Sequence, residues 1–332
     1  MQILRIAFGQ KGGSETKLFE IPIVLTSLLG SCLLPDPHVP AARVDFAFGA
    51  RVNLGPTVNS PQADSFPLIS RDGRELYFAS TRPAGHGDWD IWMSKRARVE
   101  DPWGAPVNLG PGINSTSFDC ITGLSSDGLT LHFFALTGAG GELYTATRPT
   151  KDAPWGPRVN LGTVVNRPGG VGLGNDISGT LSPDDLELFF ASDRPGTLGN
   201  WDIYVTTRAT RSDPWGPPVN LGPTINTSRV EFPLSVSPDG LVLFFVADRP
   251  SGLGGFDTWM TRRPCKGAAW SEPANLGPSF NTSQGDILGS ISPDGQWCYL
   301  GEWNGAPPGP SSDLWMARII PQLVSTRMEN EP

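Results

Sequence analysis

The segment Trp215-Gly-Pro-Pro-Val-Asn-Leu-Gly-Pro-Thr-Ile-Asn226 decides the fold, because close copies of it recur along the chain. Further copies begin at Trp103, Trp155 and Trp270, and a version led by phenylalanine occupies 48–59. The Asn-Leu-Gly triplets of successive copies begin 55, 52, 60 and 55 residues apart. A repeat of this length indicates structural units that are stacked in a row or arranged radially.

Each repeat predicts four short strands. A Ser-x-Asp-Gly turn, with Asp185 replacing the glycine in the third repeat, stands before a continuous apolar run such as Leu243–Val246. Asp-Gly between apolar runs is typical of a hairpin, and a run without polar alternation predicts a strand buried on both faces. A third strand such as Asp202–Val205 and the Trp-x-x-Pro-Val-Asn-Leu-Gly segment complete the unit. Four antiparallel strands repeated radially make a propeller blade.

The two ends of the repeat region are complementary. The fifth repeat has its third strand at 313–317 but no outer segment after it, whereas an isolated outer segment stands at 48–55. An N-terminal strand that completes the last blade would close the ring and leave no exposed sheet edge. We therefore predict an all-β fold, a five-bladed β-propeller of four-stranded antiparallel blades over 45–320.

The third repeat also carries a family resemblance. Its Ser182-Pro-Asp turn, its Leu188-Phe-Phe-Ala-Ser-Asp-Arg-Pro195 strand and its Trp201-Asp-Ile-Tyr204 strand resemble the TolB-type, WD40-like (PD40) propeller repeat of exported bacterial proteins. The resemblance covers about 45–320, which is nearly all of the mature chain. It implies the propeller fold and a binding or scaffold role, because such repeats serve many partners.

The N-terminal region differs from the repeats. Lys11 and Lys17 precede a short apolar run that ends at Ser31-Cys32, which is the pattern of a secretory signal. Leu29–Cys32 resembles a bacterial lipobox, in which the cysteine is lipidated; an ordinary signal peptide is the alternative. We expect an exported protein that is periplasmic, anchored to the outer membrane as a lipoprotein, or extracellular. The expected organisation is a signal peptide at 1–31, a Pro-rich tether at 32–44, the propeller at 45–320 and a tail at 321–332.

Composition excludes some partners. The 332 residues carry a formal net charge of −8 and no basic run, which argues against a surface for nucleic acid or anionic lipid. Membrane contact is therefore expected only through a lipid anchor, and we expect a monomer. Cys120, Cys265 and Cys298 have neither disulfide-framework nor metal-ligand spacing, so we predict that they are small core residues.

A carboxylate stands six residues before the serine of every turn, and an asparagine lies in each preceding loop. The carboxylates are Asp64, Asp119, Asp176, Glu231 and Asp286, and the asparagines are Asn59, Asn114, Asn166, Asn226 and Asn281. At the start of the innermost strands, these groups would surround one mouth of the central channel. Their oxygens could bind Ca²⁺, the hydroxyls of a sugar or the cationic groups of a partner. Bracing of neighbouring blades explains the same recurrence.

Two functions follow from this ring. The first is a non-catalytic binding or scaffold propeller that contacts an envelope protein or glycan through its channel-mouth loops. The alternative is a carbohydrate-active enzyme similar to the five-bladed arabinanases and fructosidases, with its two carboxylates among Glu231, Asp119 and Asp286. Glycoside hydrolysis requires two such groups in different environments.

One further pattern lies near the same loops. Three repeats place an arginine eight residues before an aspartate, and we expect these pairs to form salt bridges that brace the loops. The pairs are Arg82 with Asp90, Arg194 with Asp202 and Arg249 with Asp257.

Overall fold

A computed structural model describes residues 43–138, 140–167, 175–283, 285–303 and 312–324. The predicted signal peptide, Cys32 and nearly all of the tether lie outside these residues, as does most of the predicted tail. Within the described part of the chain, no helix is long and apolar enough to cross a bilayer.

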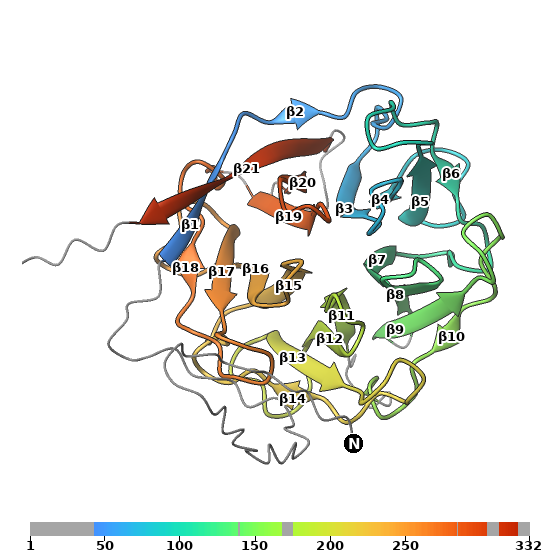
Figure 1. Ribbon diagram of the computed structural model, residues 1–332. Coiled ribbons are helices and arrows are strands. Elements are labelled where there is room, and N and C mark those ends of the chain that lie inside the picture. The colour runs from blue at the N-terminus through green and yellow to red at the C-terminus, as the bar shows by residue number, and fades with distance from the viewer. Residues whose placement is uncertain (1–42, 139, 168–174, 284, 304–311, 325–332) are drawn as a thin grey trace, which may run out of the picture. The chain divides into compact units, whose positions relative to one another are not determined.

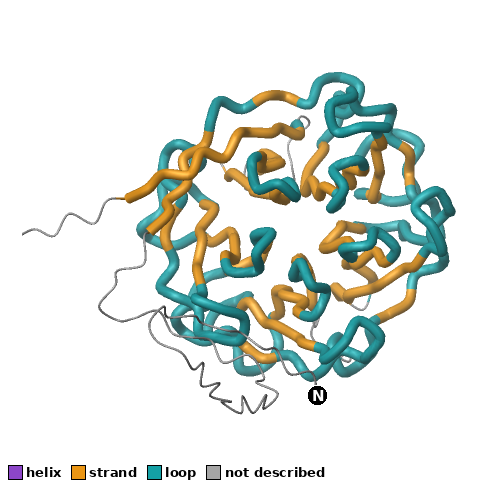
Figure 2. Tube along the Cα trace, viewed as in Figure 1, coloured by secondary structure: helices purple, strands orange, loops and turns teal. Residues whose placement is uncertain are grey.

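The propeller prediction is confirmed. Five antiparallel sheets stand around a common centre, and the strand that carries the recurring carboxylate lies innermost in each sheet (Figures 1 and 2). Blade 1 contains β3 (Asp64–Ile69), β4 (Glu75–Ser80), β5 (Asp90–Lys95) and β6 (Val107–Asn108). Blade 2 contains β7 (Asp119–Leu124), β8 (Thr130–Thr137), β9 (Gly140–Thr147) and β10 (Val159–Asn160). Blade 3 contains β11 (Asp176–Leu181), β12 (Glu187–Ser192), β13 (Asp202–Thr207) and β14 (Val219–Asn220). Blade 4 contains β15 (Glu231–Val236), β16 (Val242–Ala247), β17 (Asp257–Arg262) and β18 (Ala274–Asn275). Blade 5 contains β19 (Gly285–Ile291), β20 (Trp297–Trp303) and β21 (Leu314–Val324), together with β1 (Arg43–Phe48) and β2 (Val52–Asn53) from the N-terminal side.

The N-terminal strands close the ring in blade 5. As predicted, β2 takes the outer position and pairs with β21 through Val52 and Asn53. A second strand that was not predicted, β1, pairs with the other half of β21, with Phe48 opposite Ile319. Since β21 is 11 residues long, β2 alone would leave part of its edge unpaired, and β1 covers that part.

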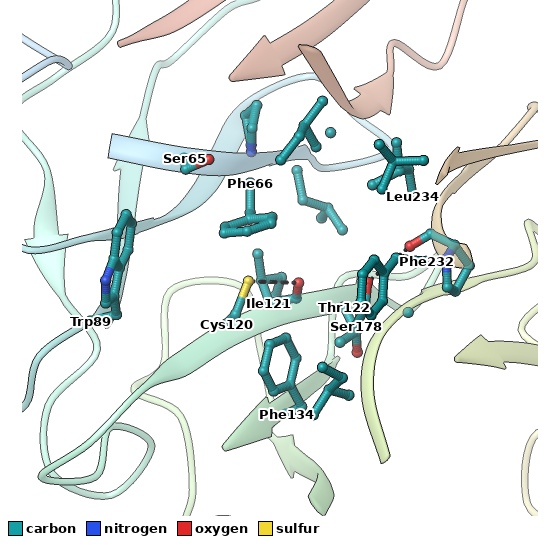
Figure 3. A pocket seen from close by; sticks show the side chains of 18 of the residues that line it. Ser65, Phe66, Trp89, Cys120, Ile121, Thr122, Phe134, Ser178, Phe232 and Leu234 are labelled. Carbon is teal, nitrogen blue, oxygen red and sulfur yellow. Dashed lines mark hydrogen bonds between the residues drawn. The ribbon is translucent and has the colours of Figure 1, made fainter. Parts of the chain in front are cut away.

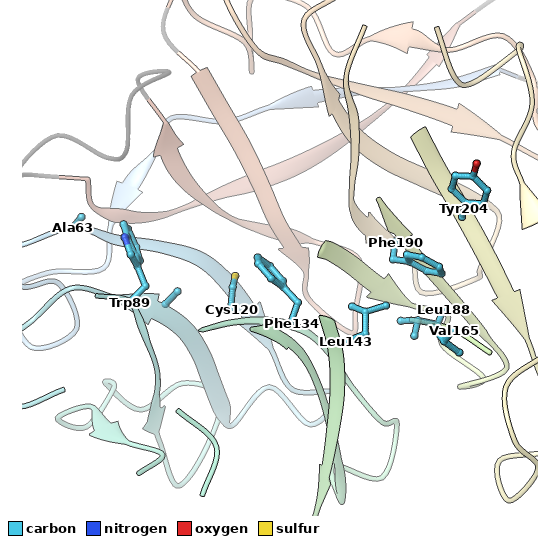
Figure 4. Close-up of a cluster of buried hydrophobic side chains, with 10 residues drawn as sticks. Ala63, Trp89, Cys120, Phe134, Leu143, Val165, Leu188, Phe190 and Tyr204 are labelled. Atoms are coloured by element: carbon cyan, nitrogen blue, oxygen red, sulfur yellow. The ribbon is translucent and has the colours of Figure 1, made fainter. Parts of the chain in front are cut away.

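The core lies between neighbouring blades. Every residue of β4, β12 and β16 is buried, as the continuous apolar runs predicted. One cluster includes Trp89, Phe134 and Phe190, which come from blades 1, 2 and 3 (Figure 4). Side chains of neighbouring sheets therefore bury each other around the ring.

The repeated tryptophans join the blades, as predicted. Trp155 of blade 2 meets Tyr77 of blade 1 edge-on, with ring centroids 6.4 Å apart. Trp215 and Trp270 meet His132 and Phe189 of the preceding blades in the same way. An arginine of the same blade stacks on the ring of each repeated tryptophan, as Arg148 does on Trp155 at 4.4 Å.

The outer strands are shorter than predicted, at two residues each. In blade 3, the Asn220 Oδ1 atom accepts a hydrogen bond from the Gly222 amide at 2.7 Å, and Gly222 has φ +80°. This left-handed conformation suits glycine and turns the chain away from the sheet. The Asn-Leu-Gly triplet is therefore mainly a turn that leads into the next blade.

The cysteine prediction holds for two of three residues. Cys120 and Cys298 are buried free thiols, and burial raises the pKa of the Cys298 thiol to about 12. Cys265 is only half-buried, so its assignment to the core was wrong.

Candidate functional site

The five recurring carboxylates start the innermost strands, but their side chains are buried within the blades. Asp64, Asp119 and Glu231 are 0 % exposed, and Asp176 and Asp286 are 1 % exposed. Each accepts a hydrogen bond from a backbone amide of the loop that enters its strand, as Asp64 Oδ2 does from the Ser60 amide at 2.6 Å. This contact fixes the loop between successive blades.

Arginines neutralise these carboxylates, and the predicted pairing was wrong. Arg82 contacts Asp64 at 2.5 Å, Arg194 contacts Asp176 at 2.7 Å, and Arg249 lies 3.7 Å from Glu231. Their predicted partners Asp90, Asp202 and Asp257 instead brace the loop between the second and third strands. Asp90, for example, accepts hydrogen bonds from the Gly87 amide and from Asn108 Nδ2 at 3.0 and 2.7 Å.

Blades 2 and 5 lack the loop arginine and obtain one from the outer segment. Arg158 lies 3.8 Å from Asp119, and Arg51 lies 2.6 Å from Asp286. Both precede the valine of the Val-Asn-Leu-Gly motif, where the other three repeats have proline. This exchange was readable in the sequence: arginine occurs at the outer position only in the two repeats without the loop arginine.

The five asparagines are equally engaged. Asn114 Oδ1 accepts from the Ile91 amide at 2.9 Å, and its Nδ2 donates to the Ile91 carbonyl and to Asn108 Oδ1. Asn59, Asn166, Asn226 and Asn281 make the same set of contacts in the other blades. Each side chain thus extends the edge of a third strand and is hydrogen-bonded within the fold.

The ring offers little to a metal or a sugar. Among the described residues, no three His, Cys, Asp or Glu side chains come together as a metal site. Ca²⁺ binding and ligand binding by the ring stay predictions that this geometry does not favour.

Two carboxylates differ from the rest. Burial raises the pKa of Asp119 and of Glu231, and their arginines lie further away than those of the other three. A hydrolase pair requires two carboxyl groups whose pKa values are pushed apart, whereas the pKa values of Asp119 and Glu231 shift in the same direction. Both side chains are also 0 % exposed, so neither faces a solvent-filled site that a sugar could enter.

The channel itself contains an apolar cavity of about 420 Å³. Its lining has no charged side chain among the described residues and consists mainly of apolar side chains, five of them aromatic. Phe66, Trp89 and Phe134 lie on one side, whereas Phe232 and Leu234 approach from blade 4 (Figure 3). The rings contact each other, since Phe118 stacks on Phe134 with centroids 5.5 Å apart and meets Phe66 edge-on at 6.4 Å. A cavity of this volume matches a small-molecule site.

The innermost strands are irregular where they line this cavity. Each shows a register shift against its neighbour, for example between Ser65 and Leu68 and between Ile177 and Thr180. Within these shifts, Phe66 has φ +55° and Ser178 has φ +54°, conformations that are strained for residues with a side chain. Bulges re-aim side chains and, like strained residues, occur often beside ligand sites.

The cavity was not predicted from the sequence. Trp89, which directly precedes Asp90, is buried in the cavity wall. A usable signal was present three residues after each carboxylate. There the repeats diverge, with Pro67, Thr122, Gly179, Leu234 and Gly289.

The comparisons with known proteins define a class by its fold. No protein-family model matches the sequence, and no curated protein is significantly similar to it. The α-L-arabinofuranosidase of Podospora anserina is 16 % identical with a TM-score of 0.52, covering 82 % of this chain and 97 % of that one. An α-L-arabinofuranosidase of Lactobacillus brevis is 17 % identical with a TM-score of 0.50, covering 80 % and 92 %. TolB of Acinetobacter baumannii is 16 % identical with a TM-score of 0.45; the match covers 83 % of this chain but only 63 % of TolB.

At these identities the similarity shows the five-bladed propeller and no particular activity. TolB proteins and glycoside hydrolases are both among the structural neighbours.

Proposed function

We propose that this chain is a non-catalytic binding propeller whose channel takes up a small apolar molecule that contains a ring. The observation that carries the proposal is the 420 Å³ cavity lined by aromatic and aliphatic side chains without a charged group among the described residues. Burial of apolar surface in such a cavity is favourable at about 25 cal/mol per Å², and aromatic walls favour ring-shaped ligands.

The same observation disfavours the two earlier candidates. A glycan requires a dense set of hydrogen-bonding groups, and the cavity wall is mainly apolar. Hydrolysis requires two exposed carboxylates, whereas Glu231, Asp119 and Asp286 are buried and lie beside arginines. An envelope partner is compatible with the proposal only if it inserts an apolar group into the channel.

The proposal includes export from the cytoplasm. It is supported by the signal-like sequence at 1–31. Lipidation at Cys32 is part of the proposal and is tested by mass spectrometry of the mature protein.

The binding test uses N-phenyl-1-naphthylamine, a neutral aromatic dye whose fluorescence rises in apolar sites. We expect saturable binding at one site per chain. Leu234→Trp, which places a larger side chain in the cavity wall, is expected to weaken binding at least tenfold. Leu253→Trp is the matched control, because Leu253 is 51 % exposed and does not line the cavity.

Failure of the dye to saturate, or equal binding by both tryptophan variants, would contradict the proposal. A parallel thermal-unfolding series with Ca²⁺, EDTA and arabino-oligosaccharides tests the alternatives. A stabilisation that persists in Leu234→Trp but disappears in Asp119→Asn or Glu231→Gln would favour the carboxylate ring instead.

A further inference from the structure

The aromatic side chains of the cavity are concentrated on one side of the channel. Four of the five come from blades 1 and 2, and we call them the aromatic wall. They are Phe66, Trp89, Phe118 and Phe134. The fifth, Phe232 of blade 4, lies apart from them (Figure 3). The other apolar side chains that blades 3, 4 and 5 contribute are aliphatic. They are Ile177, Pro233, Leu234, Val246 and Ile287.

The aromatic wall is continuous across the seam between blades 1 and 2. The Phe118 ring centroid lies 5.5 Å from those of Trp89 and Phe134 and 6.4 Å from that of Phe66. A backbone bridge between Trp89 and Phe118 joins the two blades at this point. Phe66 and Phe118 are only half-buried and line the cavity, so their rings offer accessible surface to a ligand.

Three members of the aromatic wall depart from the repeat pattern. At the place of Phe134 the other blades have Ala79, Ala191, Val246 and Gly301. At the place of Phe118 they have Ala63, Asn175, Val230 and Gly285, and at the place of Phe66 they have Ile121, Ser178, Pro233 and Leu288. Since four blades fold without an aromatic ring at each of these places, the blade architecture does not require the rings. Their gathering on one side of the cavity points to a ligand instead.

We infer that the ligand is a neutral, alkyl-substituted aromatic molecule whose ring lies on the aromatic wall and whose alkyl part lies against blades 3, 4 and 5. The inference rests on the proposed function and defines its ligand class further. Contacts between aromatic rings are favourable beyond the burial of their area, and the aromatic wall provides them. An alkyl chain gains from burial and close packing, which the aliphatic side provides.

The first test locates the ring of the ligand. It compares n-butylbenzene with n-butylcyclohexane, which differ only in the ring, as competitors of N-phenyl-1-naphthylamine. The measured quantity is the ratio of their inhibition constants, in which a change in dye affinity cancels. Phe118→Leu removes a ring and keeps an apolar side chain, so we expect it to shift the ratio roughly two- to tenfold against n-butylbenzene, as the loss of one aromatic pair predicts. Phe134→Leu serves the same purpose if Phe118→Leu does not fold.

Phe232→Leu is the matched control, because it removes a ring of the same cavity outside the aromatic wall. It is expected to leave the ratio nearly unchanged. If Phe118→Leu leaves the ratio unchanged, or if Phe232→Leu shifts it equally, the inference is overturned while the binding proposal stands. If neither dye nor probe binds the unmodified protein, the proposed function itself fails.

The second test locates the alkyl part. It measures how much more tightly n-butylbenzene competes than toluene, which lacks most of the chain. Leu234→Ala is expected to reduce this gain about fourfold, the contribution of one buried methylene group, whereas Phe118→Leu should retain the gain. An equal gain in Leu234→Ala and the unmodified protein would overturn the placement of the alkyl part.

Discussion

Replacement of Arg82 by methionine tests whether the recurring carboxylates stabilise the blades. Arg82 Nη2 lies 2.5 Å from Asp64 Oδ1 and donates to the Val58 carbonyl at 2.7 Å, and its Nε donates to Ser80 Oγ at 2.9 Å. Its guanidinium also lies 4.9 Å from the centroid of the Phe78 ring. Methionine keeps much of the apolar contact and removes the charge and all three hydrogen bonds.

The expected cost follows from the burial of Asp64. Its side chain is 0 % exposed and that of Arg82 is 11 % exposed, so Arg82→Met leaves a buried carboxylate that keeps the Ser60 amide as a donor. Loss of one partner of a buried ion pair costs about 3–5 kcal/mol. We therefore expect the free energy of unfolding to fall by about this amount, and the melting temperature by roughly 6–20 °C at 2–4 °C per kcal/mol.

The assay is urea unfolding at neutral pH, followed by tryptophan fluorescence. Arg98→Met is the control, because the Arg98 side chain is 69 % exposed in its pair with Asp101, and such pairs contribute about 0–1 kcal/mol. The double variant Arg82→Met with Asp64→Asn removes the uncompensated charge and is expected to recover part of the loss. A single-variant loss below about 1 kcal/mol, or a double variant no more stable than Arg82→Met, would refute a structural role for the pair.

Three further predictions concern the seam, a buried histidine and the channel. Phe48→Ala is expected to destabilise the fold by about 2–4 kcal/mol, because Phe48 lies on β1, which helps to close the ring, and its ring centroid is 4.8 Å from that of Phe280. Val52→Ala, at an exposed position, should change the free energy of unfolding little in the same assay. Burial and the Arg208 charge lower the pKa of His132 to about 3. Below about pH 6.5 the unfolded chain binds a proton at this side chain and the folded chain does not, so the free energy of unfolding should be about 2 kcal/mol lower at pH 5 than at pH 7. His132→Phe should remove that part of the pH dependence in urea unfolding at pH 7 and pH 5, and equal slopes would contradict the assignment. Gly289→Ala should lower the free energy of unfolding by about 1–3 kcal/mol, because the added Cβ would lie 2.2 Å from the Pro67 carbonyl oxygen. Gly112→Ala is the control: its added Cβ would have no atom within 4 Å, so thermal stability should stay nearly unchanged.

The repeat pattern correctly predicted those features of the fold that depend on local sequence. The Asp-Gly turns and continuous apolar runs identified the strands, and the complementary ends identified the closing outer strand at Val52–Asn53. The extra strand β1 was missed because its pairing depends on the length of β21, which the repeat template does not contain.

Side-chain partners were harder to predict, because they depend on how a blade folds back on itself. Arg82 and Asp90 are near each other in sequence, yet Arg82 pairs with Asp64, 18 residues away, at the start of the innermost strand. Asp90 is satisfied by loop amides and by Asn108. Both arrangements are compatible with the same spacing, and only the three-dimensional path of the loop distinguishes them.

The recurrence of the carboxylates is itself an argument against a role at a single ligand. Five like charges in one channel would repel each other, and each would lose hydration on burial. The chain offsets these costs with an arginine and a loop amide in each blade, as Arg51 and the Thr282 amide do for Asp286. The compensation is weakest for Asp119 and Glu231, whose pKa values burial raises. When the loop arginine is absent, the outer segment supplies another. A single ligand in a channel with five similar walls must instead contact residues that differ between blades, and those positions are the bulged ones. Because Pro67, Thr122, Gly179, Leu234 and Gly289 differ in size and shape, they break the symmetry of the propeller where they line the cavity.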